Sequence, residues 1–286
     1  MIRRVPKVFC LTPRIKTLAR LHRRIHALMM MEITVLASGS AANATLVRTG
    51  SACLLVDAGL SARELGRRLE ACGVLPGELD GILVTHEHGD HARGLAQWSK
   101  NHATPLYCNR RTAMILQEKV TGFGGWRIFE TGGEFAVEGI SVQSFAVPHD
   151  AVDPVGFVLR ESGCSFGFLT DLGHATTLVI EALRGVDALL VEANYDEELL
   201  QKDTKRPWST KQRIQSRHGH LSNAAAADTV SRLRHDGLAH LLLGHLSRDC
   251  NSQDLALTAV RPVLEGSSAT VACALADEVS PALRLG

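Results

Sequence analysis

The chain has 286 residues, of which 45% are hydrophobic and 21% are charged, and its formal net charge at pH 7 is +1. This composition is typical of a folded globular protein, and the length suits one large α/β domain or two small ones. No apolar run approaches the ~20 residues that a membrane-spanning helix needs, so no membrane partner is expected.

Residues 1–30 differ in charge from the rest of the chain. They hold eight of the 31 basic residues and no acidic one. The segment lacks the continuous apolar core of a secretory signal, which leaves a basic arm that touches nucleic acid, an amphipathic targeting helix or a misassigned start codon. We favour the last, because Met29, Met30 and Met31 directly precede the first expected strand. The predicted organisation is a basic extension over 1–30, disordered or not translated, and one domain over 31–286.

Seven cysteines are scattered along the chain, and no two of them form a Cys-x-x-Cys pair. Their odd number, and the position of several in apolar runs, predict reduced and buried thiols rather than a disulfide framework or a zinc knuckle. The cysteines therefore indicate a reducing compartment, and we expect a cytoplasmic location.

Hydrophobic periodicity and turn residues predict the following elements in chain order. Strands are expected over 32–37, 44–48 and 52–57, a helix over 61–72, a strand over 81–85, a helix over 94–101, a strand over 105–108, a helix over 111–120, strands over 126–129, 134–137, 140–147, 156–160 and 165–170, a helix over 178–183, a strand over 188–192, a helix over 223–234, a strand over 240–243, a helix over 254–264 and a strand over 269–274. Residues 201–217 are expected to form a polar, basic loop. Two β-rich layers with helices outside would bury this pattern, which predicts an α/β fold.

Four side chains that can bind metals lie within six positions, directly after an apolar strand: His86, His88, Asp90 and His91. In an extended segment residues two apart face the same way, so His86, His88 and Asp90 are expected to converge on one point. A turn at Gly89 would bring His91 beside Asp90. The alternative is a solvated polar loop, which would require this spacing to arise by chance. The pattern therefore predicts a site for one or two metal ions.

The segment 85–91 resembles the His-x-His-x-Asp-His signature of the metallo-β-lactamase superfamily, and the other superfamily motifs follow in order. Asp57 resembles the aspartate that supports the metal site, His149 the third histidine ligand, Asp171 the bridging aspartate and His245 the last ligand. Each of them follows an expected strand. The resemblance covers residues 31 to about 275 and implies a four-layer αββα sandwich.

The resemblance also implies two divalent metal ions, zinc or manganese. The first would be held by His86, His88 and His149, and the second by Asp90, His91 and His245, with Asp171 bridging them. Imidazole and carboxylate ligands suit these ions, and none of the expected ligands is a thiolate. Two such ions activate water and clamp the attacking and leaving oxygens of a phosphodiester.

Three further segments, residues 191–196, 219–223 and 245–251, narrow the resemblance. Together with residues 37–40 they resemble the YycJ (WalJ) family, described as exonuclease-like, and more distantly the transfer-RNA 3′-processing endonucleases. In those nucleases a glutamate orients a histidine that can protonate the leaving oxygen, and Glu192 and His220 match that pair in order and context. Asp90 would take up a proton as well as bind metal. The alternatives are that Glu192 caps a loop or helix and that His220 belongs to a helix N-terminus.

Residues 201–217 contain six Lys or Arg side chains and one tryptophan. A basic strip can follow a phosphate backbone, and an exposed tryptophan can stack on a base. The residues predicted to bind nucleic acid are Lys205, Arg206, Trp208, Lys211 and Arg213. The alternative is a solvated charged loop. His174 lies three residues after Asp171, but a surface or packing role is favoured for it.

We therefore expect a metal-dependent phosphodiesterase that acts on DNA or RNA, with the 5′-to-3′ exonuclease action that the resemblance implies. The alternative is a small-molecule hydrolase of thioesters, lactones or phosphoesters, which would need the same metals but neither the basic strip nor the Glu192–His220 pair. A non-catalytic regulatory module is a third class, and the full ligand set argues against it. No separate substrate-binding domain is expected, so substrate would be reached by loops or by a second subunit in a homodimer.

Overall fold

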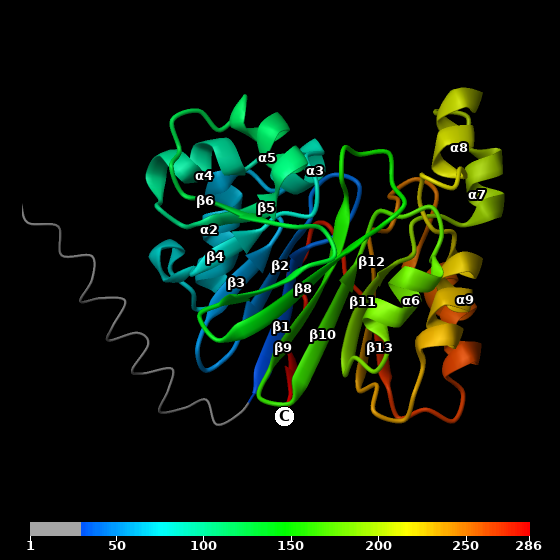
Figure 1. Ribbon diagram of the computed structural model, residues 1–286. Helices are drawn as coiled ribbons and strands as arrows, with labels where there is room; N and C mark the ends of the chain where they lie inside the picture. The colour runs from blue at the N-terminus through cyan, green and yellow to red at the C-terminus, as the bar shows by residue number, and fades with distance from the viewer. Residues whose placement is uncertain (1–29) are drawn as a thin grey trace, which may run out of the picture.

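The structure is a computed structural model that describes residues 30–286, so the extension predicted over 1–30 lies outside the described residues except for Met30. The described part of the chain forms two seven-stranded sheets, with strand orders β14-β1-β2-β3-β4-β5-β6 and β13-β12-β11-β10-β9-β8-β7. The sheets lie face to face with helices on both outer sides (Figure 1). This is the four-layer αββα arrangement, and the predicted fold class is confirmed.

The first sheet comes mainly from the N-terminal half, and the last strand of the chain completes its edge. Its strands are β1 (Met31–Ala37), β2 (Ala44–Arg48), β3 (Cys53–Val56), β4 (Gly81–Leu83), β5 (Leu106–Asn109), β6 (Trp126–Phe129) and β14 (Leu283–Leu285). The second sheet contains β7 (Glu134–Val137), β8 (Ile140–Ala146), β9 (Val155–Glu161), β10 (Cys164–Leu169), β11 (Ala188–Glu192), β12 (His240–Gly244) and β13 (Thr270–Cys273).

Helices cover the outer face of each sheet. The helices that connect the strands of the first sheet are α2 (Ala62–Ala71), η1 (Pro76–Glu78), α3 (Gly89–Ala92), α4 (Leu95–Asn101) and α5 (Arg110–Gln117). The second sheet is accompanied by α6 (Thr177–Leu183), α7 (Glu197–Lys202), α8 (Trp208–Ile214), α9 (Asn223–Leu233), α10 (Gln253–Val260) and η2 (Arg261–Leu264). None of the helices in residues 30–286 combines the length and apolar character needed to cross a bilayer.

Three apolar clusters hold the layers together. The central one lies between the sheets and includes Val35, Leu54 and Phe157, all fully buried. A second packs the first sheet on α2, α4 and α5, with Trp98 at its centre. A third packs the second sheet on α6, α9 and α10. Each fully buried Leu or Phe side chain contributes about 1.5–3 kcal/mol to stability, so the sandwich gives the loops at its edge a rigid support.

The direction of the strands brings the predicted site residues to one edge. β3 and β4 are parallel in the first sheet, and β10, β11 and β12 are parallel in the second. The carboxyl ends of parallel strands lie at the same edge, and the loops that follow them carry His86, Asp171 and His245. The helices α3, α7 and α8 lie at this same edge, at the top of Figure 1.

Most predicted elements are confirmed with small shifts at their ends, but five short elements were not anticipated. These are η1, α3, α7, α8 and β14. The prediction that residues 201–217 form a loop is wrong for Trp208–Ile214, which is helix α8. α7 has a clear local signal, because the Asp196 side chain accepts a hydrogen bond from Leu199 N and two glutamates follow in the first turn.

Candidate metal centre

The seven predicted ligands gather at the strand edge in two adjoining groups. His86, His88 and His149 form the first, and Asp90, His91, Asp171 and His245 form the second, and in each group the candidate ligand atoms lie within 4.8 Å of one another. The expectation that His86, His88 and Asp90 converge on one point is wrong. α3 begins at Gly89, so Asp90 and His91 leave the extended path and turn into the second group.

Asp171 lies between the two groups. Its Oδ1 is 3.8 Å from His149 Nε2 and 3.5 Å from His245 Nε2, and its Oδ2 is 3.0 Å from His91 Nε2. Oδ1 therefore faces one imidazole of each group, and Oδ2 faces His91 of the second group. The bridging role of Asp171 stays a prediction.

Hydrogen bonds fix the orientation of four of the histidine rings. Nδ1 lies 2.7 Å from Asp57 Oδ2 in His91, 2.7 Å from Glu192 Oε1 in His245 and 3.1 Å from the Gly219 carbonyl oxygen in His149. Because carboxylate and carbonyl oxygens can only accept, Nδ1 carries the proton in these rings. Nε2 is then directed into the centre, which is the usual arrangement of a histidine that binds metal.

Asp57 and Thr85 support the fourth ring. The Thr85 hydroxyl donates to the Asp57 carboxylate, at 2.9–3.0 Å from its two oxygens, and lies 3.0 Å from His86 Nδ1. Since a hydroxyl donates only one hydrogen, His86 Nδ1 donates to it in turn. His86 Nε2 is buried and has no hydrogen-bond partner in the described part of the chain. A buried imidazole nitrogen without a partner is costly unless a ligand occupies its lone pair, so the donor set fits a divalent metal ion.

The pKa values of the histidines are shifted in opposite directions in the two groups. Burial alone would lower the pKa of His245, but the Asp171, Asp90 and Glu192 carboxylates raise it to about 10. The pKa of His91 is likewise raised well above its usual value, against its burial, by Asp171 and Asp57. In contrast, burial and the neighbouring His91 hold the pKa of His86 well below its usual value.

Glu192 connects the second group to His220. It is the last residue of β11 and is fully buried. Its Oε1 accepts hydrogen bonds from His220 Nδ1 at 2.8 Å and His245 Nδ1 at 2.7 Å, and its Oε2 accepts from the main-chain N–H groups of Leu172 and Leu221. Burial raises the pKa of Glu192, but the charge and hydrogen bonds of the two histidines bring it down to about 2. The same carboxylate raises the pKa of His220 against its burial.

Three residues of the centre have left-handed backbone conformations. Asp57, Asp171 and His245 have φ values of 62°, 57° and 56°. Each lies just beyond the carboxyl end of a strand, β3, β10 or β12. A non-glycine residue in this region costs about 1–3 kcal/mol, so the packed sheets must impose these turns. These left-handed turns direct the three side chains toward the candidate metal centre.

Gly59 allows the first sheet to approach Asp90. A Cβ at Gly59 would lie 1.6 Å from Asp90 O and 2.7 Å from Asn43 N, two backbone atoms that cannot move independently. We expect Gly59→Ala to lower the free energy of unfolding by about 1–3 kcal/mol and to reduce the bound metal per chain, because Asp90 must shift. Urea unfolding and elemental analysis would measure the two effects. Gly77→Ala is the control, since nothing lies within 4 Å of its Cβ, and wild-type behaviour of Gly59→Ala would contradict the model of the site.

Some supporting residues were not found from the sequence. The Asn43 side chain lies 3.0 Å from His91 Nε2, and the Asn194 side chain donates to the His245 carbonyl oxygen at 2.8 Å. Thr85 directly precedes His86, and its hydroxyl was not considered. Asn194 stands two residues after Glu192 in a segment that was singled out, so its position was a signal. Asn43 could be recognised only from the structure, in which its main-chain N–H donates to the Asp90 carbonyl oxygen at 2.7 Å.

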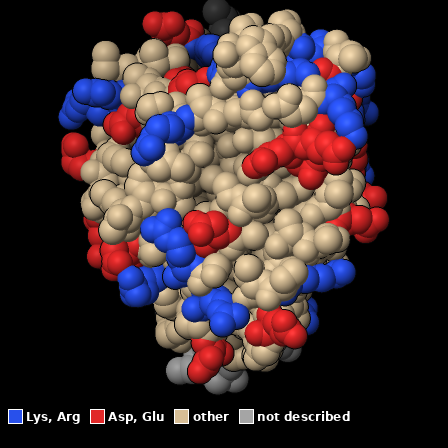
Figure 2. Space-filling model, turned by 90° about the vertical axis from the view of Figure 1, so that its right-hand side faces the viewer, with Lys and Arg blue, Asp and Glu red and all other residues tan. Residues whose placement is uncertain are grey.

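The cations of residues 201–217 are largely paired with carboxylates. Asp249 lies 2.6 Å from Lys205 Nζ and 3.1 Å from Arg206 Nη2, and Arg206 also pairs with Asp203. Arg213 pairs with Asp150, the residue after His149. The other two residues predicted to bind nucleic acid differ in exposure. Lys211 is buried and donates to the Gln201 carbonyl oxygen, whereas Trp208 is 59% exposed. Figure 2 shows blue and red groups interspersed over this side of the molecule rather than one blue band.

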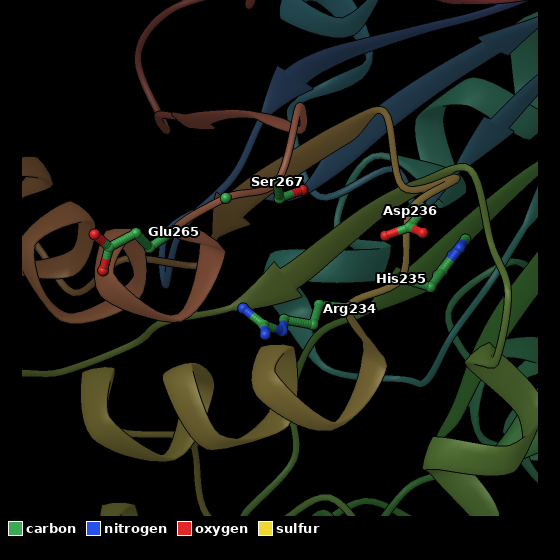
Figure 3. Close-up of a pocket in the computed structure, with 6 residues that line it drawn as sticks. Arg234, His235, Asp236, Glu265 and Ser267 are labelled. Carbon is green, nitrogen blue, oxygen red and sulfur yellow. The ribbon is translucent and has the colours of Figure 1, made fainter.

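A separate hollow of about 180 Å³ is lined by Arg234, His235, Asp236, Glu265, Gly266 and Ser267 (Figure 3). These segments precede β12 and β13, so the hollow lies at the opposite edge of the sheet from the candidate metal centre. Arg234 donates to the Val263 carbonyl oxygen, and both ring nitrogens of His235 have main-chain partners. The two basic side chains are thus already held by the protein, and this hollow offers no comparable set of ligands.

Comparisons with known proteins agree with this architecture. A family model described as a beta-lactamase superfamily domain matches residues 53–245. Exodeoxyribonuclease YycJ of Bacillus anthracis is 34% identical over 239 residues, which is 83% of this chain and 90% of that protein. Exodeoxyribonuclease WalJ of Streptococcus pneumoniae is 36% identical over 227 residues, 78% of this chain and 84% of that protein.

A solved structure supports the fold alone. The metallo-β-lactamase fold protein YhfI from Bacillus subtilis is 18% identical and has a TM-score of 0.66. The match covers 88% of this chain and 99% of that one, so the two-sheet sandwich and its outer helices are shared over nearly the whole described domain.

Proposed function

We propose that this chain, which belongs to the metallo-β-lactamase superfamily and within it to the YycJ/WalJ family, is a metal-dependent phosphodiesterase that acts on nucleic acid. The two curated relatives are named exodeoxyribonucleases, which supports DNA as the substrate and removal of nucleotides from an end as the action. The 5′-to-3′ direction belongs to the same proposal.

The observation that carries the proposal is the Glu192–His220 pair beside the two ligand groups. Asp171, Glu192, His220 and His245 place one candidate ligand atom each within 4.8 Å of one another. A hydrolase of thioesters or lactones has no need of a histidine held by a buried carboxylate at this position. Departure of an alkoxide from a phosphodiester does need a proton, and such a histidine can supply it.

We assign His86, His88 and His149 to one metal ion and Asp90, His91 and His245 to the other, with Asp171 shared. The ions, zinc or manganese, would activate water and neutralise charge on the phosphate. Asp57, Thr85, Glu192 and the Gly219 carbonyl group orient the imidazoles, which keeps each Nε2 directed inward.

His220 then acts as the general acid. Its Nδ1 is bonded to Glu192, its ring is 16% exposed, and its pKa is raised by that carboxylate and by Asp171 despite burial. The Glu192 carboxylate therefore favours the protonated form of a ring that is open to a substrate. Asp90, whose side chain is 21% exposed, is proposed to bind metal and to take up a proton, although hydrogen bonds with His245 and His91 outweigh its burial and hold its pKa well below the usual value.

Residues 201–217 are proposed to contact the nucleic acid strand. Trp208 supports this best, since an exposed indole can stack on a base. Lys205, Arg206 and Arg213 can reach a phosphate only by exchanging their carboxylate partners, and Lys211 only by leaving its buried position. A cytoplasmic location also stays a proposal, supported by six described cysteines that are all free thiols. A homodimer is a further prediction, which light scattering would check.

The test is digestion of end-labelled DNA and RNA oligonucleotides with Mn²⁺ or Zn²⁺, beside an Asp90→Ala, His91→Ala double variant. We expect progressive shortening by the wild type and a loss of at least about 10³-fold in the double variant, because the second metal ion loses two ligands. Arg184→Gln is the control, since Arg184 is exposed and its ion pair within residues 30–286 is with Glu181 on α6. Intact oligonucleotides together with cleavage of a lactone or thioester would overturn the proposal.

A further inference from the structure

Within the described part of the chain, the charge pairing of residues 201–217 leaves one exposed cation without a carboxylate partner. Lys202, Lys205, Arg206 and Arg213 each have an acidic partner, and Lys211 is buried against a carbonyl group. Arg217 is exposed and forms no ion pair with any carboxylate within residues 30–286. The positive charge available at the end of this segment therefore belongs to Arg217.

His174 holds the Arg217 side chain in place. The Arg217 guanidinium donates to His174 Nε2 at 2.9 Å, and His174 Nδ1 lies 3.1 Å from the Arg217 carbonyl oxygen. Because the carbonyl oxygen can only accept, Nδ1 carries the proton and Nε2 is the acceptor. The partner of the guanidinium is an imidazole nitrogen and not a carboxylate, so it orients the guanidinium without cancelling its charge.

The pair lies on two neighbouring chain segments that carry residues of the candidate metal centre. His174 is three residues after Asp171, and Arg217 is three residues before His220. The two segments touch, since a Cβ at Gly173 would lie 2.3–2.5 Å from backbone atoms of Ser216 and Arg217. Gly173 N also donates to the Pro148 carbonyl oxygen, next to His149. The segment that leads to His220 therefore lies against the segment that follows Asp171.

We infer that Arg217, oriented by His174, binds a phosphate of the substrate strand next to the one that is cleaved. This inference rests on the proposed function and names a binding residue for it. A guanidinium has five N–H donors in a planar fork, so it can keep its bond to His174 while two other N–H groups hold a phosphate. The predicted strip residues would then support the fold of α7 and α8 more than they bind the strand.

The experiment measures binding without turnover. Fluorescence anisotropy would follow a labelled single-stranded DNA oligonucleotide on the Asp90→Ala, His91→Ala background, over a series of salt concentrations. We expect Arg217→Gln to weaken binding about tenfold and to lower the slope of log affinity against log salt by about 0.7, the value for one phosphate contact on a single strand. Arg217→Lys should recover part of the affinity, because the charge returns without the fork. Arg213→Gln should lose less than Arg217→Gln.

Activity separates a binding role from a structural one. On an otherwise wild-type chain, Arg217→Gln should raise KM for an oligonucleotide about tenfold more than for bis(p-nitrophenyl) phosphate, which has no neighbouring phosphate. Equal losses on both substrates, or an affinity and salt slope like those of the parent, would overturn the inference. If the parent binds no oligonucleotide and the wild type cleaves none, the proposed function itself fails.

Discussion

Glu192→Gln is expected to lower the turnover of an oligonucleotide by about 10²- to 10⁴-fold, the usual contribution of a general acid. The buried carboxylate accepts from both His220 Nδ1 and His245 Nδ1 through one oxygen. It is ionised under all ordinary conditions, because those histidines bring its pKa to about 2. Glutamine fills the same space but carries no charge. His220 then loses the main cause of its raised pKa, so its protonated form is less favoured.

A change of leaving group tests this explanation. A nitrophenolate leaves without a proton, so Glu192→Gln should cost at most about tenfold on bis(p-nitrophenyl) phosphate. In the wild type, activity on an oligonucleotide should fall as pH rises through the raised pKa of His220. In the variant this decline should begin at lower pH, since removing the carboxylate lowers that pKa. Equal losses on both substrates, with less bound metal, would mean that Glu192 acts through His245 instead.

The sequence predicted the parts of this protein that depend on local order along the chain. Each of His86, Asp171 and His245 follows an apolar strand, and parallel strands deliver such residues to one edge whatever the details of their loops. The division of the ligands into two groups was harder to predict from the sequence. It depends on a helix that starts at Gly89, and α3 is only four residues long, too short for a periodic signal.

Contacts between distant segments were beyond the reach of the sequence. Residues 201–217 look basic along the chain, yet Asp150 and Asp249, which pair with Arg213, Lys205 and Arg206, come from other loops. The left-handed backbone at Asp57, Asp171 and His245 is also imposed by tertiary packing, because these residue types do not require it. Within residues 30–286, Arg217 has no carboxylate partner, and the sequence could not single it out because the partners of the other basic residues were unknown.

The two candidate metal sites are expected to respond differently to pH. In the metal-free protein the pKa of His245 is about 10 and that of His91 is well above its usual value. Both rings are therefore positively charged at neutral pH and carry a second proton, on Nε2. A metal ligand must give up that proton, so binding at the second group should release one to two protons. Its affinity should therefore rise about 10- to 100-fold for each unit of increasing pH. His86 and His149 have lowered pKa values, chiefly through burial, and are already neutral, so the first group should show little change between pH 7 and 8.

Calorimetric titration of chelator-treated protein with Zn²⁺ in two buffers of different ionisation enthalpy would measure both affinities and the protons released. The expected result is two binding events, of which only one depends on the buffer. His245→Ala should abolish the buffer-dependent event and leave the other, because the second group loses a ligand whereas His86, His88 and His149 stay intact. Two events with the same pH dependence would contradict the charge distribution derived from Asp171 and Glu192. The His91 and His245 rings of the metal-free centre would then not carry the extra protons that their carboxylate neighbours favour.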